Sequence, residues 1–294
     1  MSWPSQLRSG MGHHSDRPAF VFVHGGFHNG STWTELVAEL ADRGHASVAR
    51  DLPGAGTNAA NPNSFSRRPL DTEAFATEVS ANTATQDDRN AAVIDDVRAA
   101  SQAGNGKVVL VGHSLGGRTI SPVTETIPDD IGAVVYLTAQ LYPGDRPPPP
   151  ATPNRLMASL FVGDFTETKA FRMDVDTTEP EALEIVREVF YNDLSDSQFS
   201  TAIDRLTHCD EPLGVFTVRS NITAQRFGTV DRHYIRCLND RALILADQDA
   251  MIAATDESLG TTTTVHDMDV SHSPFYSNPA GLADVLVAIA NQHT

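Results

Sequence analysis

The sequence predicts an α/β protein whose doubly wound, mostly parallel sheet carries helices on both faces. Short apolar runs alternate with longer segments of helical spacing, which is typical of strand–helix–strand units. The run 107–111 is apolar at every position after Lys107, as expected of a parallel strand that is covered on both sides. The stretch 143–228 breaks this rhythm, which indicates an insertion into the fold.

Six strands are expected, each ending where glycine or polar residues begin. They are residues 19–23, 46–50, 107–111, 133–137, 233–238 and 261–265. Apolar residues at helical spacing predict the main helices, at 31–42, 90–103, about 117–127 and 280–293. The stretch 54–88 is rich in Asn, Thr, Ser and Pro, and we expect it to be loop-like, as a lid or a surface loop.

The domain organisation follows from these elements. We expect a flexible leader at 1–18, an α/β core at 19–142 and 229–294, and a cap insertion at 143–228. The insertion opens with four prolines and contains helical stretches at 181–191 and 198–206. An insertion after the fourth strand is expected over the carboxyl ends of the strands, where open α/β sheets bind ligands.

Composition excludes several classes of protein. The chain has 21 basic and 38 acidic residues, a net charge of −17, so nucleic acid and anionic membrane surfaces are poor partners. No apolar run reaches the roughly 18 residues of a membrane helix, and the leader lacks the apolar segment of a signal peptide. We therefore expect a soluble, cytoplasmic protein. Cys209 and Cys237 are expected to be buried reduced thiols, with a single disulfide as the alternative.

The pattern Gly112-His113-Ser114-Leu115-Gly116 matches a nucleophile elbow. Such a serine occupies a strained strand-to-helix turn, and glycines two positions away on either side remove Cβ atoms that would collide there. The alternative is a glycine-rich turn with an idle serine. The apolar strand before the pattern and the helical pattern after it favour the nucleophile.

A serine hydroxyl needs a base, and in this architecture an acid and then a histidine follow the serine along the chain. We expect His272 to be the base because it lies in the loop after the last strand; His266 is the alternative. Asp240, directly after the strand 233–238, is expected to orient the imidazole. Three other residues stay open as the acid: Asp247, Asp249 and Asp145.

Acyl transfer also needs N–H donors for a tetrahedral oxyanion. One donor is expected to be the backbone N–H of Leu115, which follows the serine. The other is expected in the loop 24–28 after the first strand, from Gly26, with Phe27 as the alternative. We expect the side chains of His24 and His28 to brace this loop by hydrogen bonds rather than to react.

From residue 20 to residue 289 the chain resembles the α/β-hydrolase superfamily. Within it, the chain is similar to the branch that holds plant methyl-ester esterases and hydroxynitrile lyases. The stretches that carry this resemblance are 23–33, the serine turn, 234–240 and 268–279. The resemblance assigns Ser114, Asp240 and His272 as a catalytic triad, and Gly26 with Leu115 as the oxyanion hole.

Departures from the family pattern narrow the activity. The lyases of this branch have a Thr where Gly25 stands and a Lys where Ser273 stands, and this chain has no lysine after Lys169. A lyase that releases cyanide needs a cation near the leaving anion, so lyase activity is disfavoured. Epoxide hydrolases and dehalogenases of this fold use an Asp nucleophile, and Ser114 argues against both.

The sequence therefore predicts a serine hydrolase, without cofactor or metal, that cleaves a carboxylic ester, lactone or thioester through an acyl-enzyme on Ser114. An acyltransferase or cyclase with the same triad, and a ligand receptor on the same fold, are the alternatives. The expected partner is a small ester-like molecule, with a homodimer left open. Residues expected to bind the substrate are Phe27, His28, Leu141 and Tyr142. Further candidates for the pocket wall are Leu115, Leu160, Phe161, Phe165 and Phe216.

Overall fold

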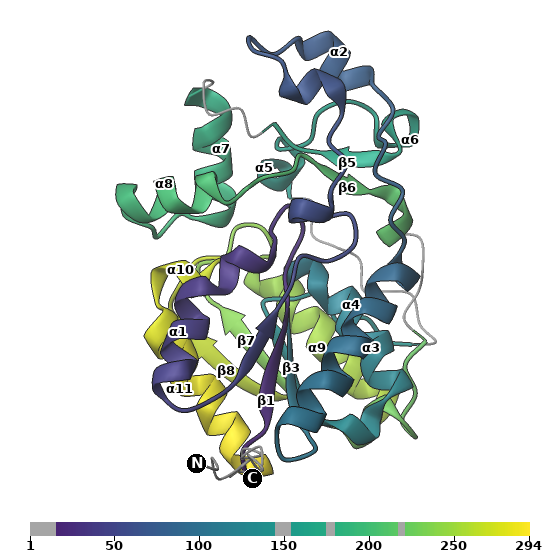
Figure 1. Cartoon of the computed structure of the whole chain (residues 1–294), viewed down its shortest axis with the longest axis vertical. Coiled ribbons are helices and arrows are strands. Elements are labelled where there is room, and N and C mark those ends of the chain that lie inside the picture. The colour runs from purple at the N-terminus through teal and green to yellow at the C-terminus, as the bar shows by residue number, and fades with distance from the viewer. Residues whose placement is uncertain (1–15, 145–153, 175–179, 217–220) are drawn as a thin grey trace, which may run out of the picture.

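The computed structural model describes residues 16–144, 154–174, 180–216 and 221–294, and Figure 1 shows their arrangement. Most of the predicted leader lies outside these residues. Asp145 and the proline run 147–150 also lie outside them.

A six-stranded sheet forms the centre of the molecule, and all of its strand pairs are parallel. Its strands are β1 (Ala19–Val23), β2 (Ser47–Ala49), β3 (Val108–His113), β4 (Ile131–Leu137), β7 (Asp231–Cys237) and β8 (Thr264–Met268). They lie in the order β2-β1-β3-β4-β7-β8. The predicted doubly wound parallel sheet is confirmed.

Helices cover both faces of this sheet (Figure 1). Two of them, α1 (Thr34–Asp42) and α11 (Pro279–Ala290), pack together on one face. The other face carries α3 (Gln86–Ala103), α4 (Gly117–Thr126) and α9 (Leu245–Leu259). Successive side chains of a strand point to opposite faces, so each strand contributes to two cores.

Strand β1 illustrates the two cores. Phe20 and Phe22 lie in one apolar cluster with Leu36 of α1 and Leu286 of α11. Their neighbours Val21 and Val23 lie in a second cluster with apolar residues of α3, α4 and α9. Full burial of each such side chain contributes about 1.5–3 kcal/mol, so the two clusters hold the sheet rigidly beneath the loops at its carboxyl edge.

A second layer lies above the carboxyl ends of the strands (Figure 1), and we call it the cap layer. Its elements are α2 (Thr72–Thr77), α5 (Arg155–Ala158), α6 (Phe165–Thr168), β5 (Ala170–Arg172), α7 (Pro180–Phe190), α8 (Asp196–Asp204) and β6 (Asp210–Pro212). Strands β5 and β6 form an antiparallel pair. The boundaries 143–228 for a separate cap stay a prediction.

Buried polar contacts tie the polar stretch 54–88 to this layer. The guanidinium of Arg172 donates to both carboxylate oxygens of Asp210, at 2.6 and 2.9 Å, and the pair is fully buried. The same guanidinium also donates to the carbonyl oxygens of Phe75 and Glu78. The stretch therefore packs into the cap layer instead of forming an independent surface loop.

Several predicted boundaries differ from the structure. The stretch 54–88 contains α2 and two short 3-10 turns, η2 (Gly56–Asn58) and η3 (Asn63–Ser66). Helix α3 begins four residues earlier than predicted because Thr85 and Asp88 form a capping box. Strand β8 lies about three residues later than predicted, which puts His266 in its middle rather than at its end.

The remaining described elements are short. They are η1 (Gly30–Trp33), η4 (Ser114–Gly116), η5 (Pro128–Asp130), η6 (Leu213–Val215), η7 (Phe227–Thr229), α10 (Pro274–Ser277) and η8 (Asn291–His293). Cys209 and Cys237 are buried and unpaired, as expected. None of the helices in the described ranges combines the length and the apolar character that crossing a bilayer requires.

Candidate active site

Ser114 lies on a sharp turn between β3 and α4. Its φ angle is +52°, a left-handed conformation that a residue with a side chain rarely adopts. A Cβ atom at Gly112 would lie 2.7 Å from Ile120, and one at Gly116 would lie 2.6 Å from the carbonyl oxygen of Val23. The predicted reason for both glycines is therefore confirmed: only residues without a side chain fit on either side of this turn.

The residue before the serine connects the turn to the loop of His272. His113 is fully buried, and its Nε2 lies 2.9 Å from the carbonyl oxygen of His272, so Nε2 donates the hydrogen bond. The two imidazole rings are 4.6 Å apart. Burial, followed by the nearby His272 and His28, lowers the pKa of His113 well below its usual value. The imidazole of His113 is therefore neutral, and its hydrogen bond links the serine turn to the loop of His272.

Asp240 and His272, which the sequence analysis paired, meet in the structure. Nδ1 of His272 lies 2.6 Å from Oδ2 of Asp240, and both side chains are buried. The same Oδ2 accepts from the hydroxyl of Thr138. The other oxygen of Asp240 accepts the backbone N–H groups of Ala242 and Leu243, at 2.7 and 2.9 Å. The carboxylate is thus fixed in place by four donors.

This arrangement determines which nitrogen of His272 can act. A carboxylate only accepts, so Nδ1 carries the proton and Nε2 keeps its lone pair. Nε2 is buried and has no hydrogen-bond partner among the described residues. The loop that contains His272 is also held from the cap layer. The carboxylate of Asp193 accepts hydrogen bonds from the backbone N–H of Ser271, at 2.8 Å, and from the hydroxyl of Ser271, at 2.5 Å.

The alternative acids and bases lie elsewhere. His266 is hydrogen-bonded to His233 at 3.1 Å. Asp249 forms an ion pair with Arg236 at 2.6 Å, and Asp247 lies in the first turn of α9. Asp145 lies outside the described residues.

The loop 24–28 passes directly beside the serine turn. A Cβ atom at Gly25 would lie 2.8 Å from Cβ of Ser114, so this position has room only for glycine. His24 braces the loop: its Nδ1 lies 2.9 Å from the carbonyl oxygen of Gly25, and its Nε2 accepts the N–H of Leu52. The expectation that this histidine has a bracing role is confirmed.

His28 braces the same loop from its other end. Its Nδ1 lies 2.8 Å from the carbonyl oxygen of Gly26, and its Nε2 is 2.9 Å from the hydroxyl of Tyr191, which directly follows α7 in the cap layer. Burial lowers the pKa of His24 to about 4 and that of His28 to about 3, so both rings are neutral at pH 7.

A buried carboxylate distinguishes the two candidate donors of this loop. Phe27 has a φ angle of +62°, and its backbone N–H donates to Oε1 of Glu211 at 2.6 Å. That N–H is therefore engaged within the protein. Gly26 and Leu115 remain the two candidate donors for a ligand oxygen, and both line the pocket that contains Ser114.

Glu211 belongs to a buried network that sequence reasoning missed. Arg89 forms an ion pair with Oε2 at 2.9 Å, and His208 lies 3.3 Å from Oε1. Burial opposes ionisation, but Arg89, His208 and the N–H of Phe27 outweigh it and lower the pKa of Glu211 to about 2. The carboxylate is thus charged at neutral pH and anchors the loop from the cap layer.

A pocket of about 160 Å³ opens beside Ser114, and its walls come from both layers. The core contributes Gly26, Phe27, Ser114, Leu115 and Gln140. The cap layer and its connections contribute mostly apolar side chains: Met157, Phe161, Phe171, Phe190, Glu211 and Phe216. Its apolar walls suit an uncharged organic group.

Only some of the predicted substrate contacts line this pocket. Phe27, Leu115, Phe161 and Phe216 do, whereas His28, Leu141 and Tyr142 are not among its lining residues. Leu141 is buried in the core cluster that contains α3 and α4, with Tyr142 packed against it. The buried ring of His28 packs against Phe190, Tyr191 and Phe275. Of the other wall candidates, Leu160 is buried in the core and Phe165 is largely exposed.

Metal-binding groups do not gather beside Ser114 in the part of the chain that the structure describes. The one cluster of His, Cys, Asp or Glu side chains found there that could hold an ion consists of Asp231, His233 and His293. It lies at the amino end of β7, on the opposite edge of the sheet from the serine turn.

Comparison with known proteins agrees with this fold and site. The model of the alpha/beta hydrolase family matches residues 20–285. The chain belongs to this family.

Curated proteins that are similar to this chain come from plants and from a bacterium. Putative methylesterase 14, chloroplastic, of Arabidopsis thaliana is 26% identical over 280 residues, which cover 92% of this chain and 71% of that protein. Methylesterase 18 of the same plant is 26% identical over 92% of this chain and 97% of its own length. The pyrethroid hydrolase of Sphingobium wenxiniae is 27% identical over 92% of this chain and 87% of its own length. The predicted resemblance to the plant methylesterase branch is confirmed.

Solved structures show the same fold. The pyrethroid hydrolase from Sphingobium faniae JZ-2 has a TM-score of 0.67 and 23% identity, and the match covers 93% of this chain and 97% of that one. Polyneuridine aldehyde esterase has a TM-score of 0.68 and 20% identity over 93% and 99% of the two chains. At these identities the likeness concerns the fold alone.

Proposed function

We propose that the protein is a serine hydrolase that cleaves a carboxylic ester through an acyl-enzyme on Ser114. The observation that carries this proposal is the buried His272, in a loop joined to the serine turn through His113. Its Nδ1 is held by Asp240, and its Nε2 has no hydrogen-bond partner in the part of the chain that the structure describes. A histidine base oriented by a carboxylate, together with a serine on a strained turn, is the combination of groups that activates a hydroxyl.

In the first half of the reaction, Oγ of Ser114 attacks the ester carbonyl while Nε2 of His272 takes the hydroxyl proton. Asp240 stabilises the imidazolium and stays ionised. The tetrahedral intermediate then collapses, the imidazolium protonates the leaving alcohol, and the acyl group remains on Ser114. Water repeats the sequence with His272 as base, which releases the carboxylic acid and restores the serine.

The negative oxygen of the intermediate needs two preorganised donors. The backbone N–H groups of Gly26 and Leu115 take this role in the proposal, since the N–H of Phe27 is already bonded to Glu211. Glu211 therefore acts as a positioning residue: by fixing Phe27 in its left-handed conformation it sets the direction of the preceding N–H.

The substrate proposed is a small, uncharged ester. The pocket of about 160 Å³ is lined mainly by aromatic and aliphatic side chains, and it contains the ionised Glu211, which disfavours an anionic group nearby. The names of the relatives, methylesterases and a pyrethroid hydrolase, support ester cleavage in this family branch.

Lyase activity is not part of the proposal. The related lyases carry a Thr at the position of Gly25, where a Cβ atom would lie 2.8 Å from both Ser114 and His113. Ser273 follows His272 in place of their lysine.

Transfer of the acyl group to an amine or alcohol is distinguished from hydrolysis by oxygen-labelled water, because hydrolysis puts the label in the released acid.

The proposal is tested with Ser114→Ala and a p-nitrophenyl ester of a short acid. We expect activity to fall by at least about a thousandfold, because the nucleophile is lost. Ser277→Ala is the matched control, since its hydroxyl has no hydrogen-bond partner among the described residues. It should keep near-normal activity. Full activity of Ser114→Ala at an unchanged melting temperature would reject the proposed mechanism.

A further inference from the structure

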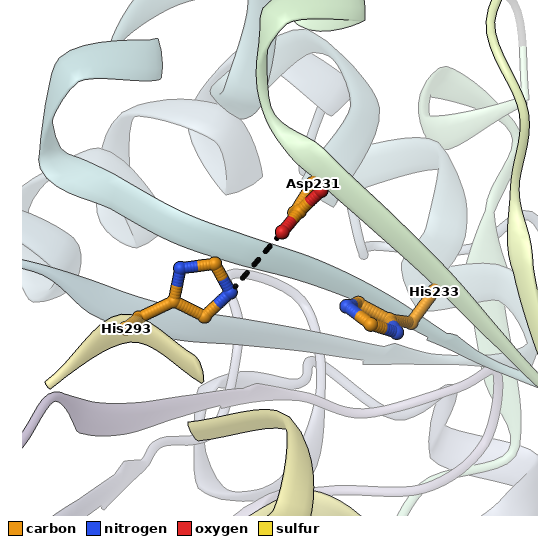
Figure 2. Close-up of side chains that lie close together, drawn as sticks. All are labelled: Asp231, His233 and His293. Carbon is orange, nitrogen blue, oxygen red and sulfur yellow. Dashed lines mark ion pairs between the residues drawn. The ribbon is translucent and has the colours of Figure 1, made fainter. Parts of the chain in front are cut away.

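Three potential metal ligands gather at the amino end of β7. Asp231 and His233 are two positions apart on this strand, so their side chains lie on the same face of the sheet. His293 comes from η8, at the end of the last helix. Figure 2 shows the three side chains gathered together: a dashed line joins the carboxylate of Asp231 to a ring nitrogen of His293, and a ring nitrogen of His233 faces the space between the three.

The spacing of these side chains is close to that of a coordination site. Oδ2 of Asp231 lies 3.5 Å from Nε2 of His293, and one ligand atom of each residue lies within 4.8 Å of the other two. The neighbouring strand leaves room for this histidine, because a Cβ atom at Gly132 of β4 would lie 3.2 Å from the His293 side chain.

His233 provides an independent indication of a ligand. The residue is 2% exposed, and its Nδ1 lies 3.1 Å from Nε2 of His266. Its own Nε2 is buried and has no hydrogen-bond partner among the described residues. A buried polar atom without a partner costs free energy, so its retention in this position calls for a partner that the protein itself does not supply.

We propose that Asp231, His233 and His293 form a binding site for a divalent transition-metal ion of the Zn²⁺ class. Two imidazole nitrogens and one carboxylate oxygen are a donor set that Zn²⁺ uses in proteins. The site leaves the proposed esterase chemistry untouched and lies on the opposite edge of the sheet.

His266 is the orienting partner in this site. When Nδ1 of His233 donates to Nε2 of His266, the lone pair of His233 is on Nε2, the nitrogen that faces the cluster. Metal-bound histidines are commonly fixed in this way through their second nitrogen. The hydrogen bond between His233 and His266 thus leaves Nε2 of His233 unprotonated, which is the form that binds a metal.

Small side-chain movements complete the coordination. Ligands about 2.0–2.2 Å from Zn²⁺ in a tetrahedral arrangement lie about 3.3–3.6 Å from one another, a separation that the Asp231–His293 pair already has. The side chain of Asp231 is 63% exposed and is the least buried of the three ligands. A fourth position opens to the cavity of about 600 Å³ that Asp231 and His293 line, where water can bind.

A metal at this site would connect β7 with the segment after α11. Because it would bind the folded chain and not the unfolded one, it should stabilise the fold. The test uses the whole chain after dialysis against a chelator, titrated with Co²⁺ and with Zn²⁺. We expect one ion per chain, visible absorption bands from bound Co²⁺, and a rise of several degrees in the melting temperature with saturating Zn²⁺.

Two substitutions of the less buried ligands make the test specific. His293→Ala and Asp231→Asn should each weaken Co²⁺ affinity by at least about tenfold and remove the thermal shift, while the rate of ester hydrolysis stays normal and reports correct folding. The matched control is the double variant H13A/H14A, which removes two consecutive histidines that lie before the described residues and should bind Co²⁺ as the unchanged protein does. Equal Co²⁺ affinity of His293→Ala and the unchanged protein, or loss of binding in H13A/H14A, would overturn the proposal.

Discussion

His272 and His233 lie at opposite edges of the same sheet and share a local design. Each ring is buried, each Nδ1 is held by a neighbouring side chain, and each Nε2 has no partner among the described residues. They differ in the group that holds Nδ1. Asp240 offers His272 a carboxylate, whereas His266 offers His233 a second imidazole.

This one difference separates two chemistries. A carboxylate stabilises the imidazolium, so a histidine that it holds can accept a proton and return it. A neighbouring imidazole gives no such support, and together with burial it keeps His233 neutral at pH 7. The partner of Nδ1 thus favours a general base at one edge and a metal ligand at the other.

The largest expected effect comes from removing the carboxylate. Asp240→Asn should lower kcat by about four orders of magnitude, because an amide cannot enforce the Nδ1–H tautomer or support the imidazolium. The measurement is the steady-state rate of ester hydrolysis. Asp247→Asn tests the alternative acid and should be nearly normal. If Asp247→Asn lost more activity than Asp240→Asn, Asp247 of α9 and not Asp240 would be the residue that orients His272.

A smaller loss is expected at the positioning carboxylate. Glu211→Gln should reduce kcat by about 10- to 100-fold with little change in KM, because the oxyanion donors shift while the apolar pocket remains. The thermal stability should also fall, since Arg89 is left buried without its charge partner. Rates must therefore be measured well below the melting temperature of the variant.

Measuring kcat and KM separately distinguishes a positioning role of Glu211 from a general loss of folded structure. Glu78→Gln is the control, because Glu78 is another carboxylate of the cap layer that binds backbone and side chain of Ser64 away from the pocket. It should keep a normal kcat. An unchanged kcat in Glu211→Gln at reduced stability would make Glu211 purely structural.

The remaining prediction concerns stability in mild acid and not the rate of hydrolysis. The pKa values of His24 and His233 are each lowered to about 4 from an ordinary 6.5. Below pH 6.5 the unfolded chain binds protons that these folded groups do not, so the free energy of unfolding should fall between pH 6.5 and 4, by at most about 1.4 kcal/mol per pH unit for each group. Urea unfolding across this range measures the slope.

Replacing one of these histidines should flatten that slope. His233→Gln removes a group whose folded and unfolded pKa values differ, so its stability should depend less on pH than that of the unchanged protein. A stability that rises as the pH falls from 6.5 to 4 would contradict the view that these rings are held neutral.

The sheet and the serine turn were predictable because their signals are local. Each core strand is a short apolar run, and five of the six predicted strands differ from the observed ones by no more than two residues at either end. The glycines at 112 and 116 marked the turn for a steric reason that the structure bears out. The capping box of Thr85 and Asp88 was equally readable and would have placed the start of α3.

The buried network around Glu211 had no such local signal in the sequence. Glu211 reaches Phe27 and Arg89 from positions 184 and 122 residues away along the chain, and no motif spacing links them. Only the packing of the cap layer on the core brings these residues together. Leu141 and Tyr142 also follow a strand end at the correct edge, but the chain packs them against the core and not along the pocket of Ser114. Their contact with the substrate stays a prediction.

The central claim is that Ser114 is the nucleophile activated by His272. The most direct measurement is reaction of the folded protein with a fluorophosphonate, followed by peptide mass spectrometry. We expect one adduct, on Ser114, formed in step with the loss of ester hydrolysis and much more slowly in His272→Ala. Complete loss of activity with the adduct on another residue, or hydrolysis that persists after Ser114 is fully labelled, would contradict it.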